Sequence, residues 1–596
     1  MDTMSEGTGH SGHTASQGPQ QQAAMPVVFA GTVGLFMPAG SGSPRTDTAV
    51  LFASPWGLEE ISTRKFRRLL AEDLSKEGMP SLRFDYPGTG DALDPPDFAG
   101  GSRVWEDSLV AAAALLRSAG YGRLVIVAQG LGAALAVNAA PRIQNLDGIA
   151  LLAPVLSGRL HLRELALWAK VVDGYLQIKE EYRVKQGVAI AGLTMPEEIA
   201  ADVRKLDLKQ ISHPVAGHCL LLAAPGQAGT AEFAARLRGL GAEVTEGAFT
   251  GHQELIANPL TARVPFGVVA KIVSWASRLK TAAPSKAATA DPAFAAPKSL
   301  FGEGFEETPV RFGAGERLYG VLCRPKGDRA GATAILLGSA YDRHSGWGRL
   351  TTETARRLAA SGVASLRFDA ANVGDSPPLA GAPLQVLYND SQQADVAEAL
   401  DYVESRALLP AIAVGRCSGA YLAFQSALKD RRLRGLVAAN SFTYYWDAAR
   451  PYDPDTTPLA LKAYQGKLFK LETLGRLFKG EIGVNSLLKV KSAIGKKISR
   501  LLWLRLGFKL MGTKEQVETQ KNFMTLLKNN ISCSLIYSQE DIGLDNILNN
   551  FRIEFRKLAG FDNVDVDIVE GADHNLTPGF SRDVFRDRIL NMASKF

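Results

Sequence analysis

The chain has few cysteines, no long apolar run and little net charge. Its 596 residues include four scattered cysteines, too few for a disulfide framework and typical of a reducing compartment. No run of about 18 or more apolar residues occurs, and the N-terminus lacks the basic-then-apolar pattern of a secretory signal, so we expect a cytoplasmic protein. The formal net charge of +6 is small for this length and gives no reason to expect a nucleic-acid partner.

What the sequence does have is an internal repeat. The pentapeptide Ser-Leu-Arg-Phe-Asp occurs at 81–85 and again at 365–369, and each copy is followed by a Gly-Asp pair, at Gly90 and at Gly374. A repeat of this length indicates one fold duplicated in tandem. A chain of 596 residues also exceeds what one hydrophobic core usually holds, which favours two domains.

Composition predicts where the domains begin and end. Residues 1–25 are mostly Gly, Ser, Gln and His and are expected to be disordered. Domain one is predicted over 26–279 and domain two over 305–596. Between them, residues 280–304 are rich in Ala, Pro and Lys, which is typical of a linker.

Each domain alternates short apolar runs with longer amphipathic segments. In domain one we expect strands at Thr48–Ala53, Ser81–Asp85, Leu124–Ala128, Gly148–Ala153, Leu220–Ala224 and Glu243–Phe249, and in domain two at Ala332–Leu337, Ser365–Asp369, Ala411–Val414, Gly435–Ala439, Ser532–Tyr537 and Val564–Val569. Apolar runs separated by helical stretches predict an α/β fold with a mostly parallel, doubly wound sheet in each domain. Helical cap insertions are expected at about 156–216 and 441–530.

A candidate nucleophile follows the third predicted strand of domain two. Cys417 is the centre of Gly415-Arg-Cys-Ser-Gly419, a small-x-nucleophile-x-small pentapeptide between strand and helix. This is the pattern of the nucleophile elbow of α/β-hydrolases, where small residues let strand and helix approach each other. A cysteine at the end of an apolar strand is more often a small buried residue. The N-terminal N–H groups of the following helix would lower the pKa of an exposed thiol there.

A cysteine nucleophile needs a base and an acid, which follow it in this fold. His574 comes directly after the last predicted strand, where the fold presents its base. The acid is expected after the strand that ends at Tyr537. Asp541 is the preferred candidate, with Asp545 and Glu540 as alternatives. The order of these residues favours a Cys-His-Asp triad.

Backbone N–H groups are expected to form the oxyanion hole. One would come from Ser418, directly after the nucleophile. The other would come from the loop after the first predicted strand of domain two, from Ser339, Ala340 or Tyr341.

Four further side chains of domain two are candidate substrate contacts. Arg343 and His344 lie in the oxyanion loop, where a cation could hold a carboxylate or phosphate. His344 is also an alternative base, although its loop precedes the nucleophile. Tyr444 and Trp446 follow the fourth strand and could line an acyl pocket or anchor the cap.

Domain one lacks the same constellation. Gly130 replaces the nucleophile, and Gln227 stands in the loop where an acid is expected, while His252 remains. Catalysis there would require Ser54 or Glu254 to be recruited. The pattern favours a degenerate domain retained for packing, regulation or binding.

The cap of domain two is basic. Between Leu461 and Leu510 there are twelve Lys or Arg and two acidic residues, and apolar residues recur every three or four positions. Such a helix could contact an anionic membrane surface at the inner membrane, an acidic carrier protein or an anionic glycan. It could equally be a lid helix with a solvated basic face.

Short motifs add a resemblance to a known superfamily. Both halves resemble α/β-hydrolases over nearly all of 26–596. With residues 54–60 (SPWGLEE) and 83–91 (RFDYPGTGD), the first half resembles serine aminopeptidase-like hydrolases that accompany bacterial exopolysaccharide and exosortase systems. It lacks their seryl elbow, so their activity does not carry over. The second half, with 415–421 (GRCSGAY), resembles a companion group with a cysteine elbow.

Cysteine elbows in this superfamily resemble those of dienelactone hydrolases, polyhydroxyalkanoate synthases and acyl-shuttling transferases. The resemblance implies an acyl hydrolase (esterase or thioesterase) or an acyltransferase that works through a Cys417 thioester. Its substrate would be an acyl ester or acyl thioester, and surface-polysaccharide or acyl-conjugate biosynthesis is the implied context. We expect no cofactor and no metal. The alternative is a non-catalytic scaffold that binds acyl or glycan intermediates. Peptidase activity is suggested by the family label alone.

Overall fold

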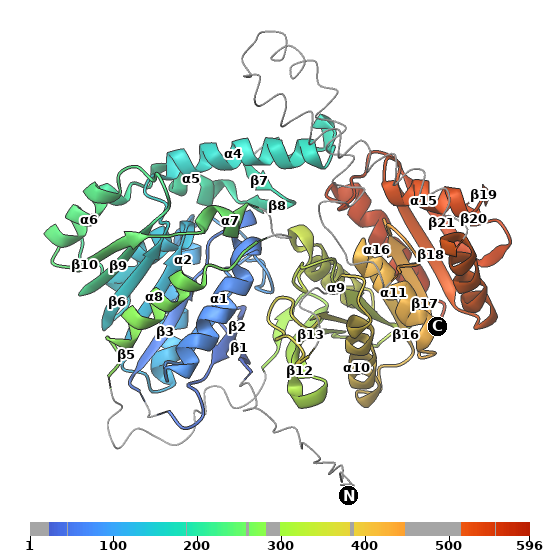
Figure 1. Cartoon of the computed structure of the whole chain (residues 1–596), viewed down its shortest axis with the longest axis horizontal. Coiled ribbons are helices and arrows are strands. Elements are labelled where there is room, and N and C mark those ends of the chain that lie inside the picture. The colour runs from blue at the N-terminus through green and yellow to red at the C-terminus, as the bar shows by residue number, and fades with distance from the viewer. Residues whose placement is uncertain are drawn as a thin grey trace, which may run out of the picture.

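The computed structural model of the chain contains two sheets, each with its own helices, which lie side by side in Figure 1. It describes residues 23–43, 46–185, 187–257, 262–281, 298–381, 387–447, 514–554 and 556–596. Domain one runs from blue to green in the figure, and domain two from yellow to red.

The sheet of domain one has eight strands in the order β1-β2-β4-β3-β5-β6-β9-β10. Their bounds are β1 Met25–Phe29, β2 Thr32–Met37, β3 Thr48–Ala53, β4 Ser81–Phe84, β5 Arg123–Gln129, β6 Leu146–Leu152, β9 His218–Ala223 and β10 Glu243–Ala248. The pairs β1–β2 and β2–β4 are antiparallel, and all other neighbours in this sheet are parallel. The central strands are apolar runs that are buried on both faces, as expected for parallel strands covered by helices.

The sheet of domain two repeats this order with added edge strands. Its bounds are β11 Leu300–Gly302, β12 Phe305–Phe312, β13 Leu318–Pro325, β14 Thr333–Leu337, β15 Ser365–Asp369, β16 Ala411–Arg416, β17 Leu433–Ala439, β18 Ser532–Ser538, β19 Ile553–Glu554, β20 Lys557–Leu558 and β21 Phe561–Val569. Without β11, β19 and β20, its strands and those of domain one follow one chain order, 1-2-4-3-5-6-7-8. The predicted duplication of one α/β fold is confirmed.

Helices cover both faces of each sheet. In domain one these are α1 Leu58–Lys76 and α8 Phe266–Ser277 on one face, and α2 Arg103–Ser118 and α3 Leu131–Ala139 on the other. In domain two they are α9 Leu350–Ala360 and α16 Gly579–Ala593, against α10 Ser391–Ser405 and α11 Ser418–Lys429. Two apolar clusters per domain result, one on each side of the sheet, as expected for a doubly wound sheet.

Other helices and one hairpin complete the labelled elements of the described chain. They are the helices α4 Gly158–Tyr175, α5 Glu197–Lys205, α6 Thr230–Gly239, α7 His252–Ile256 and α15 Ile542–Asn550, and the hairpin β7 Val188–Ile190 with β8 Leu193–Met195. Of these, α6 packs on the same face of the first sheet as α2 and α3. The elements α4, β7, β8 and α5 form the cap of domain one, between β6 and β9, and α4 crosses the top of Figure 1. In the second insertion, residues 514–528 are helical, and the basic segment 461–510 lies outside the described residues.

The predicted linker is too long at its C-terminal end. Residues 282–297 lie outside the described part of the chain, but Leu300–Gly302 form β11 and pair with β12. The bias toward Ala and Pro, which predicted the linker, stops before this strand. The strand adds an antiparallel edge to the sheet of domain two.

The repeated motif holds the two domains together. Arg83 of domain one donates to Asp375 of domain two, and Arg367 of domain two donates to Asp91 of domain one across 3.1 Å. These four residues occupy matching positions in the two copies, and all four are buried. Reciprocal pairing of this kind is what two copies of one fold produce when they meet through the same surface, so the interface has pseudo-two-fold character.

Candidate active site

Cys417 occupies a strained turn between β16 and α11. Its backbone has φ 54° and ψ −122°, a region that residues with a side chain rarely adopt. A Cβ on Gly415 would lie 2.1 Å from the carbonyl oxygen of Gly419, and one on Gly419 would lie 2.7 Å from that of Gly338. Glycine is therefore required at both flanking positions, and the local geometry is that of a nucleophile elbow.

A carboxylate and an imidazole meet beside this turn. Asp541 follows β18 and caps α15 by accepting a hydrogen bond from the Gly543 N–H at 2.8 Å. Its other carboxylate oxygen lies 2.6 Å from His574 Nδ1, in the loop after β21. Of the alternative acids, Asp545 and Glu540 are both exposed. Asp541 is thus the predicted acid that the structure places against His574.

The thiol and the imidazole shift each other's pKa. Burial alone would raise the pKa of Cys417, but the neighbouring His574, assisted by Arg416 and a side-chain hydrogen bond from Ser339, brings it below the ordinary thiol value. Burial likewise opposes the charged imidazole, yet Cys417 and Asp541 raise the pKa of His574 to about 10. These directions favour a thiolate–imidazolium pair.

Cys417 differs from the other three cysteines. Burial raises the pKa of Cys219 to about 12 and raises the pKa values of Cys323 and Cys533 as well. Those three side chains are buried, whereas Cys417 is partly exposed. A lowered thiol pKa together with access to the outside is what distinguishes a reactive cysteine from a structural one.

Polar side chains around the elbow fix the loops that meet there. Arg416 donates to Asp342 across 3.0 Å and also to Asn575, so it joins the elbow to the loop after β14 and to the loop of His574. Asn440, at the end of β17, is fully buried and donates to the carbonyl oxygen of His574 across 2.9 Å. It also accepts a hydrogen bond from the Ser538 N–H at 2.7 Å. These supporting roles could not be predicted from the sequence, in which Arg416 is visible beside the nucleophile but its burial and its partners are not.

The oxyanion loop, defined here as residues 338–346, reaches the elbow through its backbone. The Ala340 N–H donates to the Ser418 hydroxyl at 2.7 Å, and Ala340 has a φ of 52°. An acyl oxygen would have to displace this hydroxyl to use the Ala340 N–H. The backbone N–H of Ser418 lies in the first turn of α11, where helices leave N–H groups without intrahelical partners.

Arg343 and His344 do not face the elbow as expected. Arg343 donates two hydrogen bonds of 3.0 Å to Asp85 of domain one, and His344 Nε2 lies 2.6 Å from Asp91. His344 is 1% exposed, so it can reach neither a substrate nor the thiol as an alternative base. The predicted substrate contacts are interface residues, because carboxylates of domain one neutralise the cations of this loop.

Of the two aromatic candidates, one is structural. Tyr444 is 1% exposed, its hydroxyl lies 2.6 Å from that of Tyr537, and its ring packs on Phe424, so it anchors the core rather than lining a pocket. Trp446 stacks on Tyr388 with ring centroids 4.5 Å apart. Tyr388 in turn meets Tyr421, which is in the first turns of α11. Trp446 therefore remains a candidate for an aromatic wall near Cys417.

Domain one retains the elbow without the chemistry. Gly130 has φ 54° and ψ −123°, and Gln227 binds the backbone of Ala224 and Pro154 instead of a histidine. A Cβ on Gly130 would lie 2.4 Å from a carboxylate oxygen of Glu59, which therefore fills the space of the missing nucleophile. His252 Nε2 is 3.9 Å from Glu59 Oε1.

Neither of the possible replacements in domain one joins His252 in a triad. Glu254 is exposed, and Ser54 lies in the wall of a cavity between the two domains. The role of Glu59 could not be predicted from the sequence, because no spacing rule connects this residue with Gly130.

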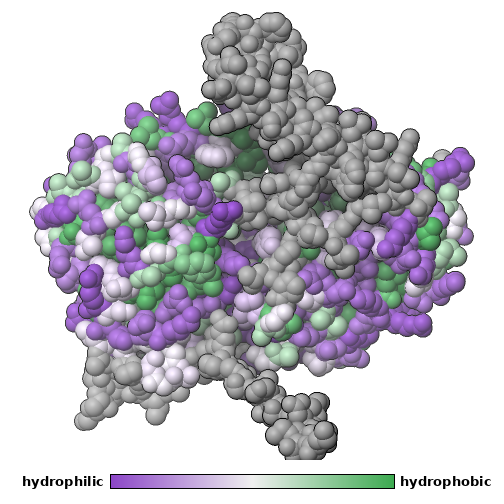
Figure 2. Space-filling view, viewed as in Figure 1, coloured by the Kyte–Doolittle hydropathy of each residue, from purple (hydrophilic) through white to green (hydrophobic). Residues whose placement is uncertain are grey.

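No helix among the described residues has the length and apolar character to cross a bilayer. In the view of Figure 2, hydrophilic residues dominate the described surface of both domains, with smaller apolar areas between them.

Comparisons with known proteins find likenesses at low sequence identity. No family model matches the sequence, and no curated protein matches it. Similar solved structures include a putative α/β hydrolase of unknown function from Agrobacterium tumefaciens (14% identity, 48% of this chain and 93% of that chain, TM-score 0.27). A dienelactone hydrolase from Anabaena variabilis is 11% identical (49% and 99%, TM-score 0.29). A lidless α/β serine hydrolase from Xanthomonas campestris is 12% identical (45% and 98%, TM-score 0.29).

Proposed function

We propose that this protein is an acyl hydrolase, an esterase or thioesterase, or an acyltransferase that works through a thioester on Cys417. The observation that carries the proposal is geometric: Cys417 occupies a strained strand-to-helix turn with φ 54°, and the Nδ1 atom of the neighbouring His574 lies 2.6 Å from Asp541. The direction in which His574 shifts the pKa of the thiol agrees with this arrangement. Hydrolysis is slightly favoured over transfer, because hydrolases are the commoner occupants of the fold. Both share the first half-reaction.

In the proposed reaction, the Cys417 thiolate attacks the acyl carbonyl carbon and forms a tetrahedral oxyanion. The N–H of Ser418 and one from the oxyanion loop stabilise the negative charge. His574 gives its proton to the leaving alkoxide or thiolate, and the C–O or C–S bond breaks, which leaves the acyl group on sulfur. A water molecule or an acceptor alcohol, amine or thiol then loses its proton to His574, attacks the thioester and releases Cys417.

The finer parts of the proposal rest on the sequence. A role in surface-polysaccharide or acyl-conjugate assembly follows from the resemblance of short motifs. Contact of the basic segment 461–510 with an acidic carrier, an anionic glycan or the inner-membrane surface follows from its charge.

Intact-mass analysis after incubation with activated acyl thioesters and esters tests the proposal. Wild type is expected to show turnover or an acyl adduct that peptide mapping places on Cys417, and Cys417→Ala neither. Activity that survives in Cys417→Ala would exclude this mechanism. If the wild type showed no adduct and no turnover, and its thiol were unreactive at neutral pH, a non-catalytic scaffold would be the better account.

A further inference from the structure

The oxyanion loop of domain two is held from outside its own domain. Asp85 of domain one accepts two hydrogen bonds from Arg343, and Asp91 accepts one from Arg343 at 3.1 Å and one from His344 at 2.6 Å. All of these side chains are at least nine-tenths buried. Charge-assisted hydrogen bonds in such surroundings are strong and directional.

The same loop reaches the elbow at its other end. Asp342 accepts a hydrogen bond from Arg416, the residue before the nucleophile, and the Ala340 N–H contacts Ser418, the residue after it. A short run of backbone therefore connects the carboxylates of domain one to both neighbours of Cys417.

Domain two by itself supplies little to hold this loop's cations. His344 has Asp369 at 3.0 Å, but Arg343 has no carboxylate of domain two within ion-pair distance among the described residues. The burial of an arginine is expensive unless it is paired, so without Asp85 and Asp91 the loop would turn Arg343 to solvent.

Domain one holds the oxyanion loop of domain two, but domain two does not hold the matching loop of domain one in the same way. Asp375, the counterpart of Asp91, binds Arg64 and Arg83, which come from a helix and a strand of domain one. The loop of domain one that corresponds to the oxyanion loop begins Ser54-Pro-Trp-Gly57 and has no cation there. Only the domain with the cysteine has its oxyanion loop held by its neighbour.

We propose that domain one acts in cis as a positioning element, in which Asp85 and Asp91 fix the oxyanion loop of domain two for the chemistry at Cys417. This inference rests on the proposed function, and it gives the degenerate domain a role. Asp85 and Asp91 are positioning residues that touch no substrate.

Asp85→Asn tests the proposal, with Asp94→Asn as the matched control. Asp94 pairs with Arg349 across the same interface, but it is exposed and Arg349 is outside the oxyanion loop. In Asp85→Asn we expect kcat for acylation to fall about tenfold or more with little change in KM, because a displaced oxyanion donor acts on the transition state. Amide hydrogen exchange should also accelerate over residues 338–346. Asp94→Asn should change neither.

A second variant and a second measurement make the result interpretable if Asp85→Asn does not fold or the wild type is inactive. Arg343→Met removes the cation while Asp85 keeps Arg64, and it should reproduce the effect if Asp85→Asn does not fold. The positioning role would be overturned if the wild type acylates and both variants keep its kcat and its amide hydrogen exchange over 338–346. If the wild type does not acylate at all, the proposed function fails, and the exchange of 338–346 alone decides whether domain one holds the loop.

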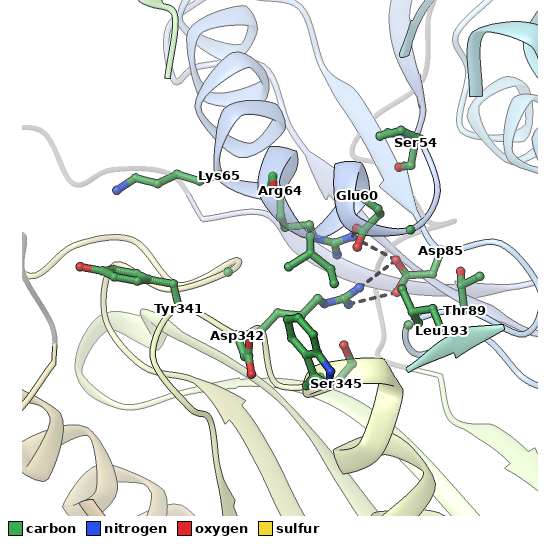
Figure 3. Close-up of a pocket in the computed structure, with 18 of the residues that line it drawn as sticks. Ser54, Glu60, Arg64, Lys65, Asp85, Thr89, Leu193, Tyr341, Asp342 and Ser345 are labelled. Atoms are coloured by element: carbon green, nitrogen blue, oxygen red, sulfur yellow. Dashed lines mark hydrogen bonds and ion pairs between the residues drawn. The ribbon is translucent and has the colours of Figure 1, made fainter. Parts of the chain in front are cut away.

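A separate observation concerns the cavity between the domains. It has a volume of about 460 Å³ and is lined by α1 and strand-end loops of domain one and by residues 341–349 of domain two (Figure 3). Cys417 is not in its wall. The volume is in the range of small-molecule sites.

Three residues of the cavity wall carry a buried donor atom without a partner. Ser62 Oγ, Arg343 Nε and Trp347 Nε1 are buried and have no hydrogen-bond partner among the described residues. Lys65, at the end of the cavity near Tyr341 in Figure 3, donates to the amide oxygen of Asn372 at 3.2 Å. Arg68 and Glu72 are its charged neighbours, and no described carboxylate lies within ion-pair distance of it. The wall therefore offers one cation, Lys65, that forms no ion pair with a described carboxylate.

The wall also contains three carboxylates, each paired with an arginine: Glu60, Asp85 and Asp342. Apolar side chains, among them Trp56, Leu193, Leu255 and Val264, line another part of it. We infer that this cavity binds a small amphipathic anion, with its carboxylate or phosphate at Lys65 and its apolar part against these side chains. The head group would accept hydrogen bonds from the Lys65 ammonium, which carries three N–H groups and has one described hydrogen-bond partner.

Calorimetric titration of Cys417→Ala with octanoate, octyl phosphate and octanol tests this site. We expect at least one anion to bind more tightly than octanol, and Lys65→Met to weaken that anion about tenfold, the loss of one charged hydrogen bond. Whichever of the two anions binds more tightly identifies the preferred head group, carboxylate or phosphate. Lys76→Met, an exposed lysine on the same helix, is the control and should bind as the parent does. Failure of both anions to bind, or equal binding in Lys65→Met, would overturn the assignment.

Discussion

Replacement of His574 by alanine is expected to slow acylation of Cys417 about 10³-fold or more at neutral pH, as for loss of the base in other nucleophile–histidine pairs. The imidazole is the main group that holds the pKa of the thiol below its ordinary value, and burial alone would raise it. Without His574, the thiolate should form only at higher pH. The rate of iodoacetamide alkylation against pH measures this directly. In wild type it should rise at a pH below the ordinary thiol value of about 8.5, and in His574→Ala above it.

The two carboxylates of this region give a matched comparison. Asp541→Asn removes the hydrogen-bond partner of His574 Nδ1, whereas Asp545→Asn changes an exposed carboxylate one turn further along α15. Only Asp541→Asn should slow acylation. An alkylation profile that is the same in wild type and His574→Ala would mean that the pair does not activate the thiol.

Asp91→Asn is expected to destabilise the protein by about 3–5 kcal/mol, the usual effect of removing one partner from a buried ion pair. Asp91 lies among Arg343, His344 and Arg367, and its carboxylate is 1% exposed. Denaturant unfolding at pH 6 measures the loss. Asp94→Asn, which changes an exposed carboxylate of the same interface, should stay within about 1 kcal/mol of wild type.

The same network predicts how stability depends on pH. Burial disfavours the charged His344, but Asp91 and Asp369 raise its pKa to about 9, while Tyr319 contacts the ring and Arg343 lies beside it in sequence. Its contribution is fully present below the unfolded value of about 6.5 and is lost as the pH rises toward 9.

At acidic pH, stability is expected to change with pH in the opposite direction. Burial opposes the charge of Asp85, but Arg343 and Arg64 lower its pKa to about 2, so its contribution is present above about pH 4 and is lost below that. Stability should therefore be greatest between about pH 4 and 6.5. In Asp91→Asn the decline above pH 6.5 should become shallower. A decline as steep as in wild type would contradict this account of His344.

The sequence predicts the parallel part of each sheet well. Each of the strands expected in either domain overlaps one in the structure, because buried parallel strands are continuous apolar runs between Gly and Pro. The antiparallel strands β1, β2, β12 and β13 were missed. Several alternate apolar with polar residues or contain Gly and Pro, so their pattern is weaker.

The triad candidates could be predicted because each of them follows the end of a strand. Parallel strands bring their carboxyl ends to one edge of the sheet, so Cys417, Asp541 and His574 come together although they are far apart in sequence. The oxyanion loop could be placed for the same reason. The partners of its cations could not, since they belong to the other copy of the fold, and periodicity within one domain does not reveal what faces it.

One signal of the interface was present in the repeat itself. Arg83 and Arg367 each stand inside a strand that is otherwise buried, and both are at most 3% exposed. A charged side chain within such a strand requires a partner. The repeated Arg and Asp therefore indicated pairing, although only the structure shows that each pairs with the other copy.

Gly130 and Cys417 share one backbone conformation, so the geometry of the elbow does not depend on the presence of a nucleophile. Both residues have φ 54°, and their ψ values differ by one degree, at −123° and −122°. The turn is thus a requirement of passing from strand to helix in this scaffold, and it persists when the nucleophile is absent. Glycine adopts it freely, while any other residue there gives up about 1–3 kcal/mol. A domain that loses its nucleophile to glycine is relieved of that strain, so loss of chemistry and gain of stability can arise from one substitution.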